Sequence, residues 1–173
     1  MKKDTAISAI WVNLIVETLE NNGINGKEIC QRAEIDYKSL SSPEEQLTHK
    51  QMKSFWDSAA DITKNNAIGL IMGNARLSGP SGALAYSLLT CQTMKESMQF
   101  VQPYIKSIAS FLAIDYSKEK DGYLITVSSS HKKPLLDQVV DSIMSYQVHM
   151  VNHAFCNTVK PLRLELVREE PQY

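Results

Sequence analysis

The chain has 173 residues, of which 18 are basic and 19 are acidic, so its formal net charge is −1. This balance makes it a poor candidate for contacting DNA or RNA itself, because nucleic-acid-binding surfaces carry an excess of positive charge. Its cysteines, Cys30, Cys91 and Cys156, are widely spaced, a pattern that predicts reduced thiols in a cytoplasmic protein and no disulfide framework.

The N-terminal region is predicted to form a helix from about Thr5 to Asn21. Its apolar residues recur at intervals of three and four, and the helix is expected to end at Gly23. These residues are Ile7, Ile10, Trp11, Leu14, Ile15 and Leu19. Polar residues, among them Asn13 and Glu17, interrupt the apolar run, so we predict neither a signal peptide nor a membrane span.

Three helix starts carry capping signatures. Asn25, Thr48 and Thr93 are each followed three positions later by Glu or Gln, the arrangement in which a side chain satisfies a free backbone N–H at a helix N-terminus. The first signature predicts a short helix over Lys27–Ala33, and the second begins a longer amphipathic helix. From Asn66 to Ala75 a further helix is predicted by its apolar spacing.

A cluster of helix-breaking residues then interrupts the helical region. Ser78–Gly82 contains two glycines around a proline and a serine, so we predict a turn there, followed by a helix over Ala83–Cys91. The first hundred residues are therefore predicted to be mostly helical.

The last third of the chain has a different pattern. Ser110–Tyr116 and Tyr123–Val127 are rich in β-branched and aromatic residues, and Asp121-Gly122 between them fits a hairpin turn. A long helix is predicted from Pro134 to about Asn157. Leu162–Arg168 alternates apolar and charged residues, which predicts a half-buried strand.

These elements predict an α+β fold. A mostly helical N-terminal part packs with a small antiparallel sheet, made of the hairpin and the later strand, and with a long C-terminal helix. We expect residues 1–173 to form one domain, because no repeat, low-complexity tract or linker divides them.

Aromatic residues are the first candidates for a binding site. Tyr86, Phe111 and Tyr146 come from the central helices, the hairpin and the late helix, and they could converge on a cavity for a small molecule between helices and sheet. An ordinary core would use the same residues. Arg76 is either a favourable charge at a helix C-terminus or the anchor of an anionic effector.

His149 and His153 lie four positions apart on the late helix, so both imidazoles could face one metal ion. Residue 150 is Met and not the Glu of a zinc-protease motif, and no third ligand is close in sequence. We therefore expect two residues that line a pocket or are partly exposed, and we predict neither a metal nor a cofactor.

No catalytic constellation is predicted. Ser81 stands in Gly-Pro-Ser-Gly, which lacks the spacing of the nucleophile elbow of serine hydrolases. The glycines at 69, 73, 79 and 82 fit neither the dinucleotide-binding nor the P-loop pattern. Because no nucleophile, base and oxyanion donor can be placed together, we do not expect an enzyme.

Several short motifs follow one another along nearly the whole chain. They are Leu19–Ile24, Ala33-Glu34, Ile68–Gly73, the turn Gly79–Gly82, the helix start Thr93–Ser97 and the segment Pro161–Val167. In their order and spacing they resemble the N-terminal effector-binding domain of AraC-type transcription regulators, in the branch labelled arabinose-binding.

This resemblance implies a cytoplasmic sensor of a small-molecule effector that works as a homodimer. In such regulators a paired helix-turn-helix domain follows the sensor and binds promoter DNA. That domain is not in this sequence, so we expect the chain to be cut from a longer regulator and to reach DNA only through the absent part. The sugar itself is not carried over, because relatives of this kind respond to chemically unrelated effectors.

Two hypotheses stay open. In the first, Tyr86, Phe111, Tyr146, His149 and His153 contact the effector, with Arg76 as its charge anchor, and binding shifts the population of a conformation. In the second, the chain is an oligomerisation and protein-interaction module without an effector, and its interior is fully packed.

Overall fold

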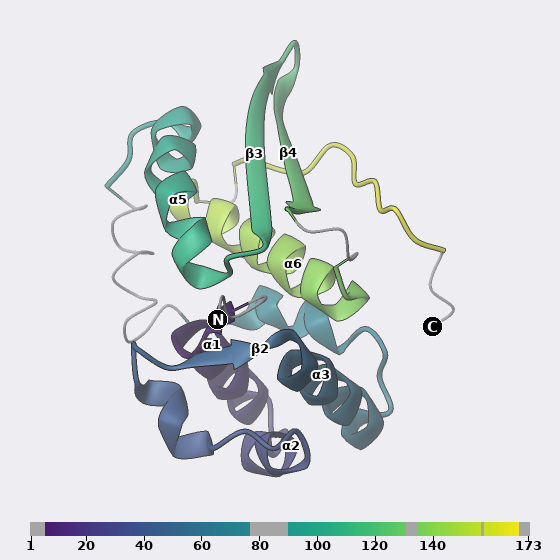
Figure 1. Cartoon of the computed structure of the whole chain (residues 1–173). Coiled ribbons are helices and arrows are strands. Elements are labelled where there is room, and N and C mark those ends of the chain that lie inside the picture. Colours follow the sequence, from purple (N-terminus) through teal and green to yellow (C-terminus); the bar gives the residue numbers. More distant parts are fainter. Residues whose placement is uncertain (1–5, 77–89, 131–134, 157, 170–173) are drawn as a thin grey trace.

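The computed structural model describes residues 6–76, 90–130, 135–156 and 158–169 (Figure 1). The first range forms a helical half with two very short strands. Its elements are β1 (Ala6–Ser8), α1 (Ala9–Asn21), α2 (Gly26–Arg32), the 3₁₀ helix η1 (Tyr37–Ser41), β2 (Gln46–Thr48), α3 (His49–Thr63) and the 3₁₀ helix η2 (Ile68–Asn74). The remaining ranges hold α5 (Met94–Ile108), β3 (Leu112–Glu119), β4 (Gly122–Ser129) and α6 (Asp137–Ala154).

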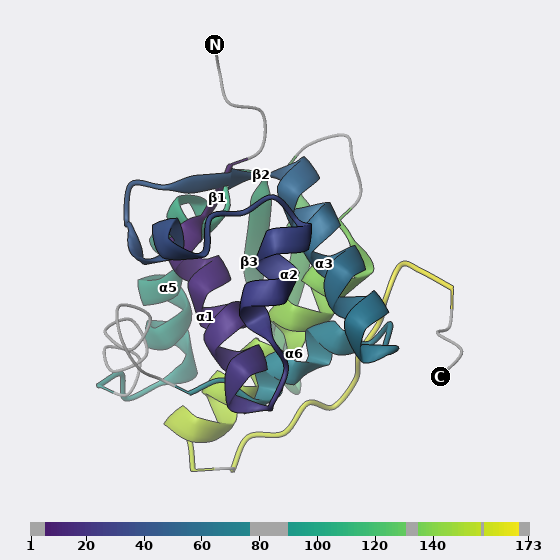
Figure 2. The ribbon, with the colours of Figure 1, turned by 90° about the horizontal axis from the view of Figure 1, so that it is seen from below.

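The core of the helical half lies where α1, α2 and α3 meet, and Figure 2 shows these helices next to one another. The apolar stripe predicted for the first helix faces this core. The fully buried side chains include Val12, Ile15, Leu19, Ile29, Leu40 and Phe55. Because a helix turns once in 3.6 residues, residues three and four apart share a face, and this spacing makes the stripe continuous.

The capping signatures are confirmed. The side chain of Asn25 accepts a hydrogen bond of 3.1 Å from the backbone N–H three residues later, and Thr48 and Thr93 do the same at 3.2 Å. At Thr48 and Thr93 the capping box is complete, because the side chain at the third helical position also accepts from the N-cap backbone N–H. Local chemistry therefore fixes where α2, α3 and α5 begin.

Two helix predictions need correction. The first helix begins at Ala9 and not at Thr5, because Ile7 pairs with Leu47 in an antiparallel β1–β2 ladder and both side chains are buried there. The helix predicted over Asn66–Ala75 is a shorter 3₁₀ helix, η2, packed against α6. The predicted turn at 78–82 and helix at 83–91 fall mainly on residues 77–89, which lie outside the described residues.

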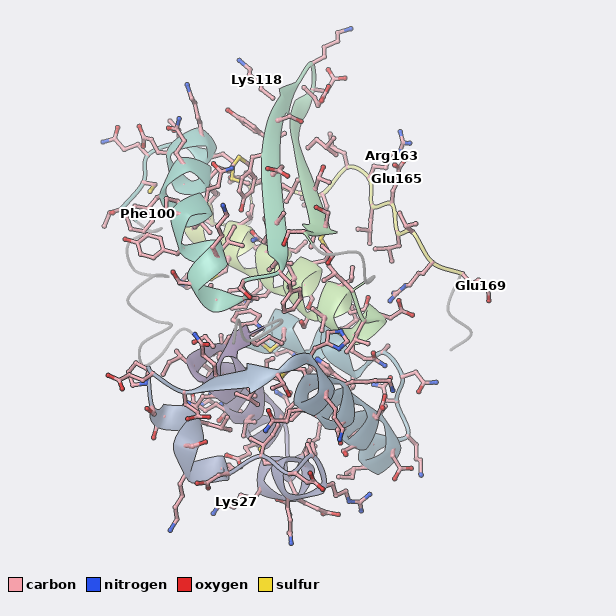
Figure 3. The ribbon with its side chains drawn as sticks, in the orientation of Figure 1. Lys27, Phe100, Lys118, Arg163, Glu165 and Glu169 are labelled. Atoms are coloured by element: carbon pink, nitrogen blue, oxygen red, sulfur yellow. The ribbon has the colours of Figure 1, made fainter. Side chains whose placement is uncertain are left out.

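The predicted hairpin is present, with one difference in its turn. Strands β3 and β4 pair antiparallel, and Glu119 is opposite Gly122, so Lys120 and Asp121 form the two-residue turn. The turn thus lies one residue earlier than the predicted Asp-Gly pair. Figure 1 shows the hairpin projecting beyond the helices, and Figure 3 shows Lys118 near its tip.

Helix α6 lies between the helical half and the hairpin (Figure 1). It covers Asp137–Ala154 and is therefore shorter than predicted at both ends. It packs very closely on η2, since a methyl group added at Gly69 would lie 2.3 Å from the carbonyl oxygen of Gln138. A glycine is needed at position 69 because any larger side chain would overlap the backbone of α6.

The α+β class is confirmed, but the later strand is not formed. The residues from Pro161 to Val167 have no strand partner in the described structure, and they run along the outside of the molecule (Figure 1). Leu162 and Leu164 are 82% and 59% exposed, and Arg163 forms an ion pair with Glu165 on the same exposed segment (Figure 3). Alternation gives a segment two faces, but a strand also requires backbone hydrogen bonds to a neighbouring strand.

Candidate functional site

A cavity of about 90 Å³ lies between the helical half and the hairpin-and-α6 half. Residues from both halves form its wall. From the helical half come Ile7, Trp11, Ile15, Met52 and Trp56. From α5, β3 and the link between them come residues such as Val101, Ile105, Phe111 and Ile114. The cavity is thus lined by segments that are far apart in the sequence.

Helix α6 supplies one whole side of the cavity. The residues concerned are Val139, Ser142, Ile143, Tyr146, Gln147 and Met150. Their spacing of three and four places them on one face of the helix. Asp141 lies on the opposite face, where it is 4% exposed and accepts a 2.7 Å hydrogen bond from Nη2 of Arg168.

The wall is mainly carbon, and none of the described residues that form it carries a charge. Its aromatic rings pack edge to face, as Trp11 and Tyr146 do with ring centroids 5.1 Å apart. Burial raises the pKa of the Tyr146 phenol to about 12, so this group is neutral at physiological pH. The cavity is therefore suited to neutral, apolar molecules.

Two of the polar wall groups already have partners. The hydroxyl of Ser142 donates to the carbonyl oxygen of Val139 at 2.8 Å. The side chain of Gln147 hydrogen-bonds Tyr116, whose pKa is raised because burial outweighs that bond. The indole N–H of Trp56 differs from both, because it is buried and has no hydrogen-bond partner.

A smaller hollow of about 30 Å³ adjoins the cavity between α5, the hairpin and α6. Val101, Gln147 and Met150 line both spaces. A molecule in the cavity could therefore extend a substituent past these three side chains.

The structure brings together two of the six residues proposed from the sequence. Phe111 and Tyr146 both line the cavity. Arg76 follows η2, is exposed and lines neither hollow, whereas Tyr86 lies outside the described residues.

The two histidines lie beside each other on α6 but outside the cavity wall. The rings of His149 and His153 stack with centroids 6.4 Å apart, and His153 is exposed. Within the described part of the chain, no group of three or more His, Cys, Asp and Glu side chains is placed to hold a metal ion. The histidine pair thus has no third ligand there.

Sequence reasoning missed Trp11, Trp56 and Gln147. Trp11 and Trp56 were assigned to apolar helix stripes, where an ordinary core residue follows the same spacing. One signal was available, because the chain has two tryptophans and each carries a polar N–H that usually finds a partner when buried.

Residues 23–173 match the family described as the arabinose-binding domain of AraC transcription regulators, N-terminal. The chain belongs to this family. No curated protein matches it.

The members of this family are ligand-sensing regulatory domains of transcription regulators and do not form an enzyme class. In the described ranges of this chain, none of the helices is long and apolar enough to cross a membrane.

Proposed function

We propose that this AraC-type domain senses a small effector that binds in the cavity between its two halves. The observation that carries the proposal is the position of the cavity. Its wall combines Trp11 and Trp56 of the helical half with Phe111 and with one face of α6. A molecule bound there would contact both halves at once and would stabilise one arrangement of them over others.

Helix α6 offers a route from the cavity to the C-terminal segment. Its cavity face carries Tyr146, and its opposite face carries Asp141, which holds Arg168 of the segment after α6. The side chains of Asp141 and Arg168 are only 5% and 13% exposed, so the segment is fixed to the helix at this point. A shift of α6 would therefore move the chain that follows it.

We further propose that this chain is one domain of a longer regulator, and that a helix-turn-helix domain beyond it binds DNA. A two-state response of this kind needs an effector that binds one state more tightly than the other. The reading frame downstream of Tyr173 tests the proposal. About a hundred further residues with two helix-turn-helix patterns are expected, and a stop codon there would contradict it.

Effector binding is tested by thermal unfolding of the chain with a library of small molecules, since a ligand that binds only the folded state raises its stability. Phe111 and Tyr146 are the proposed contacts from the original six residues. Tyr146→Ala should remove the ligand-induced rise in melting temperature. His153→Ala is the matched control on the same helix, because this exposed residue lies outside the cavity wall, and it should leave the rise unchanged.

The opposite pattern of ligand responses would place the effector site outside the cavity. If His149→Ala and His153→Ala remove the ligand response while Tyr146→Ala retains it, the effector binds at the histidine pair. If no compound stabilises the unaltered chain, the sensor proposal fails.

A second candidate function is self-association. On α5, Phe100 and Tyr104 are 36% and 46% exposed and their rings lie 5.4 Å apart, so they form an apolar patch on the surface. Figure 3 shows Phe100 on the outside of α5. Exposed apolar patches are common at interfaces between proteins. We propose a homodimer that uses this patch, and sedimentation of Phe100→Glu should then show monomer where the unaltered chain shows dimer.

A further inference from the structure

We propose that the cavity selects a compact, neutral, mainly apolar molecule with one hydrogen-bond acceptor, which accepts from Nε1 of Trp56, and that it does not bind a sugar. This inference rests on the proposed function for the existence of an effector. It adds the chemical class of that effector.

The indole of Trp56 supplies the first argument. The side chain belongs to α3, is 1% exposed and lines the cavity, yet its N–H has no hydrogen-bond partner. Buried donors nearly always have a partner, so each exception needs an explanation. A bound molecule that places an acceptor oxygen at this N–H would satisfy the donor.

The other polar groups of the wall are less in need of a partner. Ser142 donates to Val139, and Gln147 hydrogen-bonds Tyr116. Within the described wall, Trp56 is the side chain whose buried donor has no partner. A ligand with one acceptor oxygen matches this single unpartnered donor.

The small number of polar groups in the wall also argues against a sugar and against an anion as the ligand. A pentose carries several hydroxyl groups, and each hydroxyl that is buried without a partner weakens binding. A carboxylate or phosphate would need a cation, but no charged side chain lines the described wall. The family name mentions arabinose, whereas this wall fits an apolar ligand.

The volume limits the size of the ligand. An engineered apolar cavity of about 150 Å³ accepts benzene, whereas the space here is about 90 Å³ with an adjoining hollow of about 30 Å³. A single ring therefore enters only with an outward shift of α6 or the hairpin, and its short substituent would lie toward Val101 and Met150. Small aromatic ketones, aldehydes and esters belong to this class.

The experiment compares three probes on the unaltered chain: acetophenone, ethylbenzene and L-arabinose. The first two have nearly the same shape, but only acetophenone carries an acceptor oxygen. We expect acetophenone to bind about tenfold more tightly than ethylbenzene, the effect of one hydrogen bond to a buried donor. L-arabinose should neither bind nor raise the melting temperature.

Nuclear magnetic resonance gives a direct readout, because the chain has two tryptophans, and Trp11 and Trp56 both line the cavity. With ¹⁵N-labelled protein, acetophenone should move the Trp56 indole N–H resonance downfield, and ethylbenzene should not. Trp56→Phe should remove the preference, so that acetophenone and ethylbenzene bind this variant with about the same affinity. Leu124→Ala, at an exposed position on β4 outside the cavity wall, is the control and should keep the preference.

The other outcomes distinguish failure of the acceptor contact, of the ligand class and of the sensor function. Equal affinities for the two aromatic probes, or a Trp56 resonance that does not respond to acetophenone, would overturn the acceptor contact even if Trp56→Phe failed to fold. Binding of L-arabinose in place of the aromatic probes would overturn the ligand class and leave the sensor function intact. Absence of binding by both aromatic probes overturns this inference, and only failure of the whole library removes the sensor function.

Discussion

The two halves of the molecule bury their helices to different degrees. Helix α1 has 13 residues and buries Ala9, Val12, Leu14, Ile15, Val16, Thr18 and Leu19. Helix α6 has 18 residues but buries Asp141, Ser142, Ile143 and Met150. In the hairpin, every residue of β4 is exposed or half-buried. The helical half is thus a tightly packed scaffold, and the other half is held to it by fewer buried side chains.

This difference explains why the cavity lies at the boundary. Packed cores have few voids and respond to changes of a single methylene group, whereas regions with fewer buried contacts open at a lower free energy. A ligand that enters between the halves needs to move only the less buried one. The helical half thus supplies a fixed side of the cavity wall, and α5, β3 and α6 supply the side that is held by fewer buried residues.

The largest expected effect tests the scaffold. Phe55→Ala removes a fully buried ring of α3 and should lower the free energy of unfolding by about 3–5 kcal/mol. Leu124→Ala on β4, where the side chain is 52% exposed, should change it by less than about 0.5 kcal/mol. Urea unfolding measures both, and similar losses at the two positions would contradict the comparison.

The buried ion pair tests whether the less buried half contains one strongly stabilising contact. Arg168→Met leaves the carboxylate of Asp141 buried without its cation and should cost about 3 kcal/mol. The double variant Asp141→Leu/Arg168→Met should recover most of that loss, because no charge then remains buried. If the single variant costs nothing in urea unfolding, Asp141 reaches water and the segment is not fixed to α6.

The contact between the halves is tested at η2. Gly69→Ala would place a methyl group 2.3 Å from the carbonyl oxygen of Gln138, so the helices must separate, at a cost of about 2 kcal/mol. Gly73→Ala is the matched control in the same 3₁₀ helix, because its nearest neighbour would be Cβ of Ser145 at 3.8 Å. Thermal unfolding of both variants should therefore show a loss at position 69 alone.

The smallest effect is a pH dependence within the scaffold. Burial, with a contribution from Glu20, raises the pKa of the Cys30 thiol from 9.0 to about 11. The folded state then keeps a proton that the unfolded state releases, so this contribution is complete below about pH 9 and is lost as the pH rises to about 11. We expect a loss of up to about 2 kcal/mol.

Urea unfolding from pH 8.5 to 10.5 measures this slope. Cys30→Ala should have a shallower slope than the unaltered chain, and Cys156→Ala, at an exposed position, should have the same slope. A slope that does not depend on Cys30 would show that water reaches this thiol and that the scaffold is less closed than its burial indicates.

The features predicted correctly from the sequence depend on local chemistry. The caps at Asn25, Thr48 and Thr93 join residues three positions apart, and the hairpin joins neighbouring segments, so each could be inferred without the rest of the fold. Only a strong tertiary contact that favoured another local structure could have prevented these caps and this hairpin from forming.

The features that were missed depend on distant partners. The β1–β2 ladder exists because Ile7 meets Leu47, and three-residue strands leave almost no periodic signal. The strand predicted at 162–168 has the alternation but pairs with no strand in the described structure. Sequence therefore specified which faces are apolar, but not which of them meet.

The candidate site shows the same limit. Phe111 and Tyr146 were proposed because aromatic residues line apolar cavities, and both lie on the wall. Trp56 was overlooked because its helix spacing is that of a core residue, and its unpaired N–H is visible only once its surroundings are known. The sequence could therefore predict that aromatic residues line the site, but it could not predict which of their polar groups would lack a hydrogen-bond partner.

The close approach of η2 to α6 also limits the direction of any response. With the backbone of Gln138 already against Gly69, α6 cannot advance toward the scaffold when the cavity fills. A displacement of α6 by a ligand would therefore have to be directed away from η2, and it would carry the C-terminal end of the helix and the segment after it.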